Sequence, residues 1–242
     1  MSQETYDVVV LGAGNAAFCA ALAAQENGSS VIMIEAAPLE EAGGNSRYTA
    51  GAIRFAHEGL QDLTTVLDLN QDEIENADFG VYTTDQFYDD LFRLTQYRAD
   101  ADKAEMLVTK SLETVQWMKS RGVRFQPSYG RQAFKVDGKY RFWGGLCVET
   151  WGGGEGLIEL ETKAAKENGI EILYETKGLS LLYDDEKVYG LRVKHKGKVR
   201  EIHAGAVVLA SGGFEANPET VSYTHLRAHE TEADLVCRLL LE

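Results

Sequence analysis

Small residues at positions 12–17 are spaced as in a turn that holds a phosphate group. The stretch reads GAGNAA, which fits the pattern G-x-G-x-x-G/A. Gly12 permits a tight bend, Gly14 lets a phosphate approach the main chain, and Ala17 lets the following helix lie close to a sheet. No charged side chain follows until Glu26, so the positive end of that helix is free for an anion. We therefore expect Gly12, Gly14, Ala16 and Ala17 to bind the phosphates of a dinucleotide.

An acidic residue follows at the place where a dinucleotide site needs one. The apolar run at residues 31–34 predicts a strand that ends at Glu35. A carboxylate there accepts hydrogen bonds from a ribose diol and repels a 2′-phosphate, which disfavours NADP. A glycine turn in some other α/β protein is the alternative. The strand before the turn, the helix after it and the position of Glu35 favour dinucleotide binding.

Two later stretches combine glycines with short polar or apolar side chains. Residues 43–52 read GGNSRYTAGA, and such free main-chain donors and short polar side chains suit a flat, polar-edged heterocycle or a ribityl chain. Residues 205–214 read GAVVLASGGF, which predicts an apolar strand that ends in a glycine pair. That strand would return the backbone to the phosphate edge of the same sheet.

The order of predicted elements indicates an α/β fold. Strands are expected at residues 7–11, 31–34, 170–174, 178–183, 188–194, 199–203 and 205–210. Helices are expected after the glycine turn and at residues 85–97, 101–120 and 157–167. This order predicts a βαβ unit, a long insertion, a β-meander and a last buried strand. We divide the chain into an N-terminal βαβ part (1–60), a helical insertion (61–150), a second part of the same domain (151–220) and a tail (221–242).

Composition sets limits on the partners of the chain. The 242 residues are 44% hydrophobic and 26% charged, which is typical of a globular protein with a substantial core. A formal net charge of −14 argues against nucleic acid or an anionic membrane surface as a partner. Without a basic, apolar leader or a long apolar run, we expect no membrane insertion and a cytoplasmic location. The three cysteines lack metal-binding spacing, so no metal site is expected.

Three segments together resemble the FAD-dependent fumarate reductase and succinate dehydrogenase flavoprotein family. They are GAGNAA with Glu35, GGNSRYTAG at residues 43–51, and VVLASGGFEANPE at residues 207–219. The resemblance implies a Rossmann-like FAD-binding domain, with a parallel sheet, helices and a β-meander. It also implies hydride transfer between FAD and a small polycarboxylate, with a separate electron-transfer partner as an option.

The resemblance assigns roles to individual residues. It implies that Gly12, Gly14 and Ala17 wrap the pyrophosphate and that Glu35 holds the adenosine ribose. Further implied contacts are Gly44, Asn45, Ser46, Ala50 and Gly51 along the ribityl chain and isoalloxazine, Gly178 at the adenine, and Ala210, Ser211 and Gly212 on the other side of the cofactor.

The segment at residues 43–56 is most similar to family members that oxidise tricarballylate to cis-aconitate. Three alternatives are open. The chain could come from a fumarate reductase-like enzyme that acts on another small acid, from a non-catalytic partial FAD-binding module, or from a plain NAD-binding protein.

Relatives with covalent flavin carry a histidine shortly after the GG-x-S turn. Here Arg47, Tyr48 and Thr49 follow that turn, and no histidine precedes His57, so we expect non-covalent FAD. His57 itself is expected to be a surface or core histidine.

The C-terminal stretch departs from the family pattern. Residues 221–242 read VSYTHLRAHETEADLVCRLLLE and resemble a translated sequencing-adaptor artefact, although their apolar spacing also permits a short helix. We expect a non-native tail on an incomplete FAD-binding domain, with the substrate-capping domain absent. In the family, the residues that clamp the substrate and move its proton come from later segments. We therefore assign no catalytic residue and expect this fragment alone to be inactive.

Overall fold

A computed structural model of the chain describes residues 5–213. Contacts divide the chain into two compact units, Met1–Ala210 and Ser211–Glu242. The helices and strands of the described part all lie in the first unit. None of these helices is long and apolar enough to cross a lipid bilayer.

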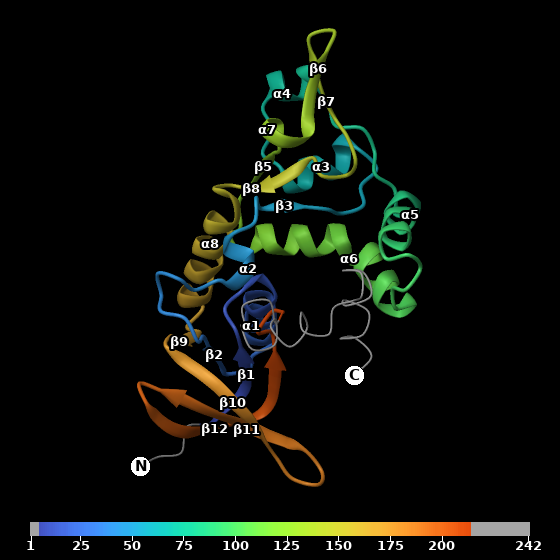
Figure 1. Ribbon diagram of the computed structural model, residues 1–242. Helices are drawn as coiled ribbons and strands as arrows, with labels where there is room; N and C mark the ends of the chain where they lie inside the picture. The colour runs from blue at the N-terminus through green and yellow to red at the C-terminus, as the bar shows by residue number, and fades with distance from the viewer. Residues whose placement is uncertain (1–4, 214–242) are drawn as a thin grey trace, which may run out of the picture. The chain divides into compact units, whose positions relative to one another are not determined.

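The first unit contains a six-stranded sheet in the order β10-β11-β12-β1-β2-β9 (Figure 1). Its strands are β1 (Thr5–Leu11), β2 (Val31–Ile34), β9 (Glu171–Leu173), β10 (Thr176–Tyr183), β11 (Val188–His195) and β12 (Lys198–Leu209). Strands β12, β1, β2 and β9 run parallel, whereas β10, β11 and the start of β12 form an antiparallel meander. The predicted α/β class, with a parallel sheet and a β-meander, is confirmed.

Strand β12 differs from the sequence expectation. Two strands were expected, at residues 199–203 and 205–210, but the structure has one continuous strand. Its first half pairs with β11, where Ile202 lies opposite Leu191, and its second half pairs with β1, where Val207 lies opposite Val9. A single strand thereby joins the meander to the parallel part of the sheet.

Strands β1 and β2 pack against apolar residues on both faces of the sheet. On one face Val10 and Met33 pack with Phe18 of α1 (Asn15–Glu26) and Ile158 of α8 (Gly153–Glu167). On the other face Val9, Ile32 and Ile34 pack against residues of the meander strands β11 and β12. Burial on both faces explains why β1 and β2 read as continuous apolar runs rather than alternating ones.

The helices expected from the sequence are present. The helix at residues 101–120 has the expected bounds, and those at residues 85–97 and 157–167 have altered ends. These helices correspond to α5 (Thr84–Leu94), α6 (Ala101–Ser120) and α8. Helix α5 ends earlier than expected because Gln96 and Tyr97 have φ angles of 51° and 60°, which a right-handed helix does not allow. Helix α8 begins earlier, at Gly153, after Gly152 in the left-handed region with φ 78°. Shorter helices are α2 (Gly44–Arg47), α3 (Leu60–Val66), α4 (Gln71–Asn76) and α7 (Tyr129–Gln132).

Two small sheets lie in the middle of the chain and were not foreseen. One has the order β3-β8-β5 and the other β4-β7-β6. Their strands are β3 (Ala52–Ile53), β4 (Ala77–Asp78), β5 (Phe125–Pro127), β6 (Ala133–Val136), β7 (Lys139–Phe142) and β8 (Val148–Thr150). A core that includes Phe55, Phe79, Val115 and Phe142 joins these sheets to α6. Residues 61–150 therefore hold strands as well as helices.

Candidate cofactor-binding site

The turn after β1 has the geometry of a phosphate-binding turn. The Gly12 amide donates to the Ile34 carbonyl at 2.8 Å, and its φ of 117° lies in the region that favours glycine. Helix α1 begins directly afterwards, with Gly14 as its N-cap, no capping side chain and no acid in its first turn. The start of α1 therefore presents main-chain N–H groups and the positive end of the helix dipole to an anion.

The second glycine-rich stretch lies against this turn. Ser46 Oγ accepts a hydrogen bond from the Asn15 amide at 3.1 Å. A Cβ atom on Gly14 would lie 3.4 Å from both the Gly43 carbonyl oxygen and Ser46 Oγ. Helix α2 and the start of α1 are therefore in contact, although they are separate in the sequence.

Glu35 lies at the end of β2, beside the end of β1. Its amide donates to the Leu173 carbonyl at 2.9 Å, and its carbonyl accepts from the Thr176 amide at 2.8 Å. Side-chain Oε1 accepts from the Ala37 amide at 2.8 Å. Among the described residues, none donates to Oε2, which is the oxygen available to a ribose hydroxyl.

Two more of the predicted residues meet the last residue of β1. The Ala210 amide donates to the Leu11 carbonyl at 2.9 Å. A Cβ atom on Gly178 would lie 2.8 Å from Leu11 Cδ1, so a larger residue at position 178 would have to displace the end of the Leu11 side chain. Ser211 and Gly212 belong to the second unit, and their contact with the cofactor stays a prediction.

The loop at Ala50 and Gly51 is held by the start of α8. The Thr150 amide donates to the Gly51 carbonyl at 2.9 Å, and the Gly154 amide donates to the Thr49 carbonyl at 3.0 Å. A Cβ atom on Gly154 would overlap the Ser46 and Arg47 carbonyl oxygens. Sequence reasoning missed this role of the glycine run at residues 152–156. The signal was present, because repeated glycines at a helix start indicate close backbone approach.

The described histidines are engaged away from this loop. His57 is 2% exposed, its Nδ1 accepts from the Gly59 amide at 3.2 Å, and its Nε2 lies 3.5 Å from Cys147 Sγ. Burial lowers the pKa of His57, although the Asp62 carboxylate opposes this. His57 is thus a core histidine with partners. Within residues 5–213, no group of three or more His, Cys, Asp or Glu side chains is arranged to hold a metal ion.

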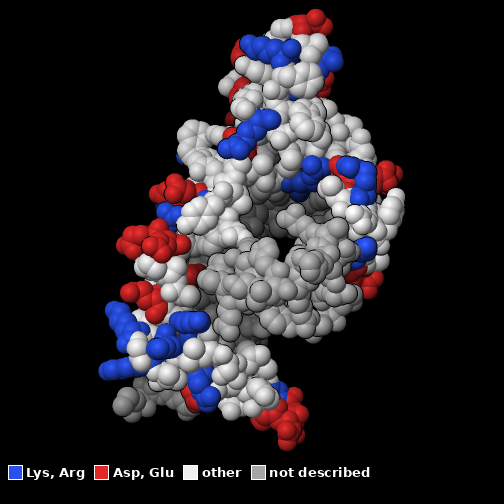
Figure 2. Space-filling model, viewed as in Figure 1, with Lys and Arg blue, Asp and Glu red and all other residues white. Residues whose placement is uncertain are grey.

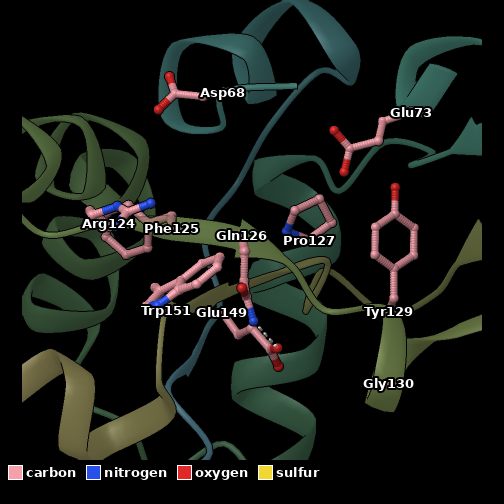
Figure 3. A pocket seen from close by; sticks show the side chains of 10 residues that line it. All are labelled: Asp68, Glu73, Arg124, Phe125, Gln126, Pro127, Tyr129, Gly130, Glu149 and Trp151. Atoms are coloured by element: carbon pink, nitrogen blue, oxygen red, sulfur yellow. Dashed lines mark hydrogen bonds between the residues drawn. The ribbon is translucent and has the colours of Figure 1, made fainter. Parts of the chain in front are cut away.

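A cleft of about 380 Å³ lies at β5 and β8. Figure 3 shows Arg124 and Trp151 at one end and Tyr129 at the other, with its hydroxyl toward Glu73. Burial and the Glu73 carboxylate raise the pKa of Tyr129 to about 12. None of the predicted cofactor-binding residues lines this cleft.

A model of the family described as FAD binding domain matches residues 7–236. The chain belongs to this FAD-binding domain family. Its cofactor is therefore FAD, and the residues present fit that group: a start of α1 with no N-cap side chain and no acid, glycines where a Cβ would fill the cradle, and an acid directly after β2.

The curated relatives of this chain include fumarate reductases. A probable fumarate reductase of Shewanella frigidimarina strain NCIMB 400 is 32% identical over 223 residues, covering 91% of this chain and 34% of the relative. A fumarate reductase (cytochrome) of Shewanella frigidimarina is 29% identical over 222 residues, covering 90% and 35%. The solved open conformation of a flavocytochrome c3 fumarate reductase is 30% identical with a TM-score of 0.68, covering 92% and 36%. The chain spans about a third of the length of these relatives.

Proposed function

We propose that this chain is the FAD-binding part of an oxidoreductase that moves hydride between FAD and a small polycarboxylate. The single observation that supports this most is the meeting of the turn at residues 12–17 with the loop at residues 43–51, through Asn15 and Ser46. Two contacting segments of this kind can bind the pyrophosphate at the turn and the ribityl chain at the loop. The assigned substrate is tricarballylate, which would be oxidised to cis-aconitate.

The roles of the residues follow from their positions. When bound, FAD supplies the flavin ring that exchanges hydride with the substrate. The amides at the start of α1 hold the pyrophosphate, Glu35 orients the adenosine ribose, and the loop from Gly44 to Gly51 aligns the ribityl chain and ring. Gly178 and Ala210 contact the nucleotide, and the contacts of Ser211 and Gly212 with the cofactor stay predictions. With His57 buried and partnered, we propose that FAD is held without a covalent bond.

Reduction of another small unsaturated acid is the second candidate function. The names of the relatives, which are fumarate reductases, favour it. The cytochrome in the name of one relative also favours a separate electron-transfer partner. The third candidate is a non-catalytic partial FAD-binding module, favoured by the chain's coverage of only 34% of its relative. The free thiols of Cys19 and Cys147 support a reducing compartment such as the cytoplasm.

Absorption spectra and dye-coupled turnover assays of the purified chain distinguish the three candidate functions. Flavin absorption bands that persist through gel filtration are expected, and a folded chain that does not retain FAD would contradict the proposal. Reduction of a dye acceptor by tricarballylate would support the dehydrogenase, whereas oxidation of a reduced dye by fumarate alone would support the reductase. Bound FAD without either turnover would identify the module as non-catalytic by itself.

A further inference from the structure

Arg54 lies close to the loop that we assign to the flavin. It directly follows β3 and comes three residues after Gly51. Three residues of extended chain span at most about 10 Å, so the Arg54 backbone lies within that distance of the Gly51 backbone. Arg54 and Ala52 share one face of the extended segment, and the core residues Ile53 and Phe55 share the other.

Two side chains hold the guanidinium of Arg54 in place. Arg54 Nη1 donates to the Tyr82 hydroxyl at 2.7 Å and to Asp90 Oδ2 at 2.7 Å. The Tyr82 hydroxyl also donates to Asp90 Oδ2 at 2.8 Å. The Arg54 side chain is 28% exposed, and no described residue bonds to its Nε or Nη2. A fixed guanidinium with free donors is suited to bidentate binding of a carboxylate.

A second arginine pairs with the same carboxylate as Arg54. Arg93 Nη2 pairs with Asp90 Oδ1 at 2.7 Å, so two guanidinium groups share one carboxylate. Hydrogen bonds from Arg93 and Tyr82 lower the pKa of Asp90, which keeps the carboxylate ionised. In Figure 2, basic and acidic side chains gather over α5. In a chain with a net charge of −14, an anionic substrate requires such a local positive group.

We propose that Arg54 binds a carboxylate of the substrate, with Tyr82 and Asp90 as its positioning residues. This inference rests on the proposed function and deepens it by naming the group that recognises the substrate class. Arg54 offers bidentate donors near the flavin loop, whereas the other half-buried ion pair, Arg121 with Glu26, links α6 to α1 away from that loop. Arg54 binds one carboxylate of a small polycarboxylate, and the remaining carboxylates of that substrate are bound by other groups.

The test uses the full chain loaded with FAD. Tricarballylate is titrated while the change in flavin absorbance is recorded, for the wild type and for Arg54→Gln. Losing a charge-assisted pair predicts about 10- to 100-fold weaker tricarballylate binding, with FAD affinity unchanged. Arg54→Lys should recover part of the affinity, because it restores the charge without the bidentate geometry.

Arg121→Gln is the matched control. Its side chain is 27% exposed, pairs with a carboxylate and lies over an aromatic ring, as Arg54 does. This variant should bind tricarballylate like the wild type.

The possible failures are distinguishable. A folded wild type that does not bind FAD would overturn the proposed function. An FAD-loaded wild type with no response to tricarballylate would overturn both the assigned substrate and the role of Arg54. An Arg54→Gln variant with unchanged tricarballylate affinity would overturn the role of Arg54 alone. If Arg54→Gln does not fold, Tyr82→Phe removes one partner of Nη1 and keeps the charge. It should weaken tricarballylate binding several-fold, and unchanged affinity there would also contradict the inference.

Discussion

A substitution at position 14 can test the binding role of the glycine turn without disturbing its folding. Gly14 has φ −87° and ψ 177°, which any residue adopts. A Cβ there would make ordinary contacts of 3.4 Å with the Gly43 carbonyl and Ser46 Oγ. We predict that Gly14→Ala keeps the melting temperature of the FAD-free chain. It should weaken FAD binding about tenfold, because the methyl occupies the path of the phosphate.

Fluorescence quenching of FAD measures this affinity, and a thermal melt measures the stability. Gly130→Ala is the control, since a Cβ at position 130 meets nothing within 4 Å and its φ is not positive. Equal FAD affinity in Gly14→Ala and the wild type would show that phosphate does not approach this turn.

Glu161 on α8 is a buried acid whose pKa is raised by its burial. It is 1% exposed, no described residue bonds to its Oε2, and Cys19 Sγ lies 3.9 Å from Oε1. Burial raises the pKa of Glu161 from 4.5 to about 8. Between these pH values the unfolded chain releases the proton and the folded chain keeps it. The free energy of unfolding therefore falls as pH rises through this window.

Glu161→Gln cannot ionise and retains the shape of the neutral acid. From pH 5 to pH 8 the wild type should lose up to about 4 kcal/mol of stability relative to this variant. Urea unfolding at several pH values measures the difference. Parallel stability curves for the two proteins would contradict a buried, neutral Glu161.

At the scale of elements, the sequence predicted those helices and strands in which a single residue pattern runs along the whole element. The run of valines in β1, the small residues of α1 and the 20 residues of α6 carry their own signals. The strands β3, β5 and β8 have only two or three residues, which is too short for a period to show. Their pairing is set by long-range contacts, such as Phe125 opposite Thr150.

The site shows the same division. The turn at residues 12–17, Glu35 and the loop at residues 43–51 could be named from local chemistry. The glycines that start α8 indicate a close backbone approach, but their partner could not be named from sequence, because α2 is a distant segment that packs against them. The Arg54 cluster was equally hidden, since Tyr82 and Asp90 come from outside β3.

Gly154→Ala tests the contact between α8 and α2. The added Cβ would overlap the Ser46 and Arg47 carbonyl oxygens, and backbone cannot move aside as a flexible side chain can. We predict a loss of about 1–3 kcal/mol in stability and weaker FAD binding, because α2 is displaced. Urea unfolding and FAD titration report both, with Gly130→Ala again as the reference. Wild-type stability in Gly154→Ala would show that this packing is loose.

At the scale of the whole molecule, the described histidines have partners outside the loop at residues 43–51. His57 contacts Gly59 and Cys147, His195 bonds to Thr176 at 2.7 Å, and His203 stacks on Tyr189. We predict that acid precipitation of the FAD-loaded chain leaves the yellow colour in the supernatant. Flavin retained by the washed pellet would indicate a covalent bond.

The central claim is that separate glycine-rich segments of one chain form a single FAD site. Hydrogen–deuterium exchange with and without FAD tests it most directly, because it reports protection along the chain. We predict that FAD slows exchange at residues 12–17 and 44–51 together and leaves the cleft at residues 124–130 unchanged. Protection of only one of the two glycine-rich segments, or protection centred on the cleft, would contradict this account.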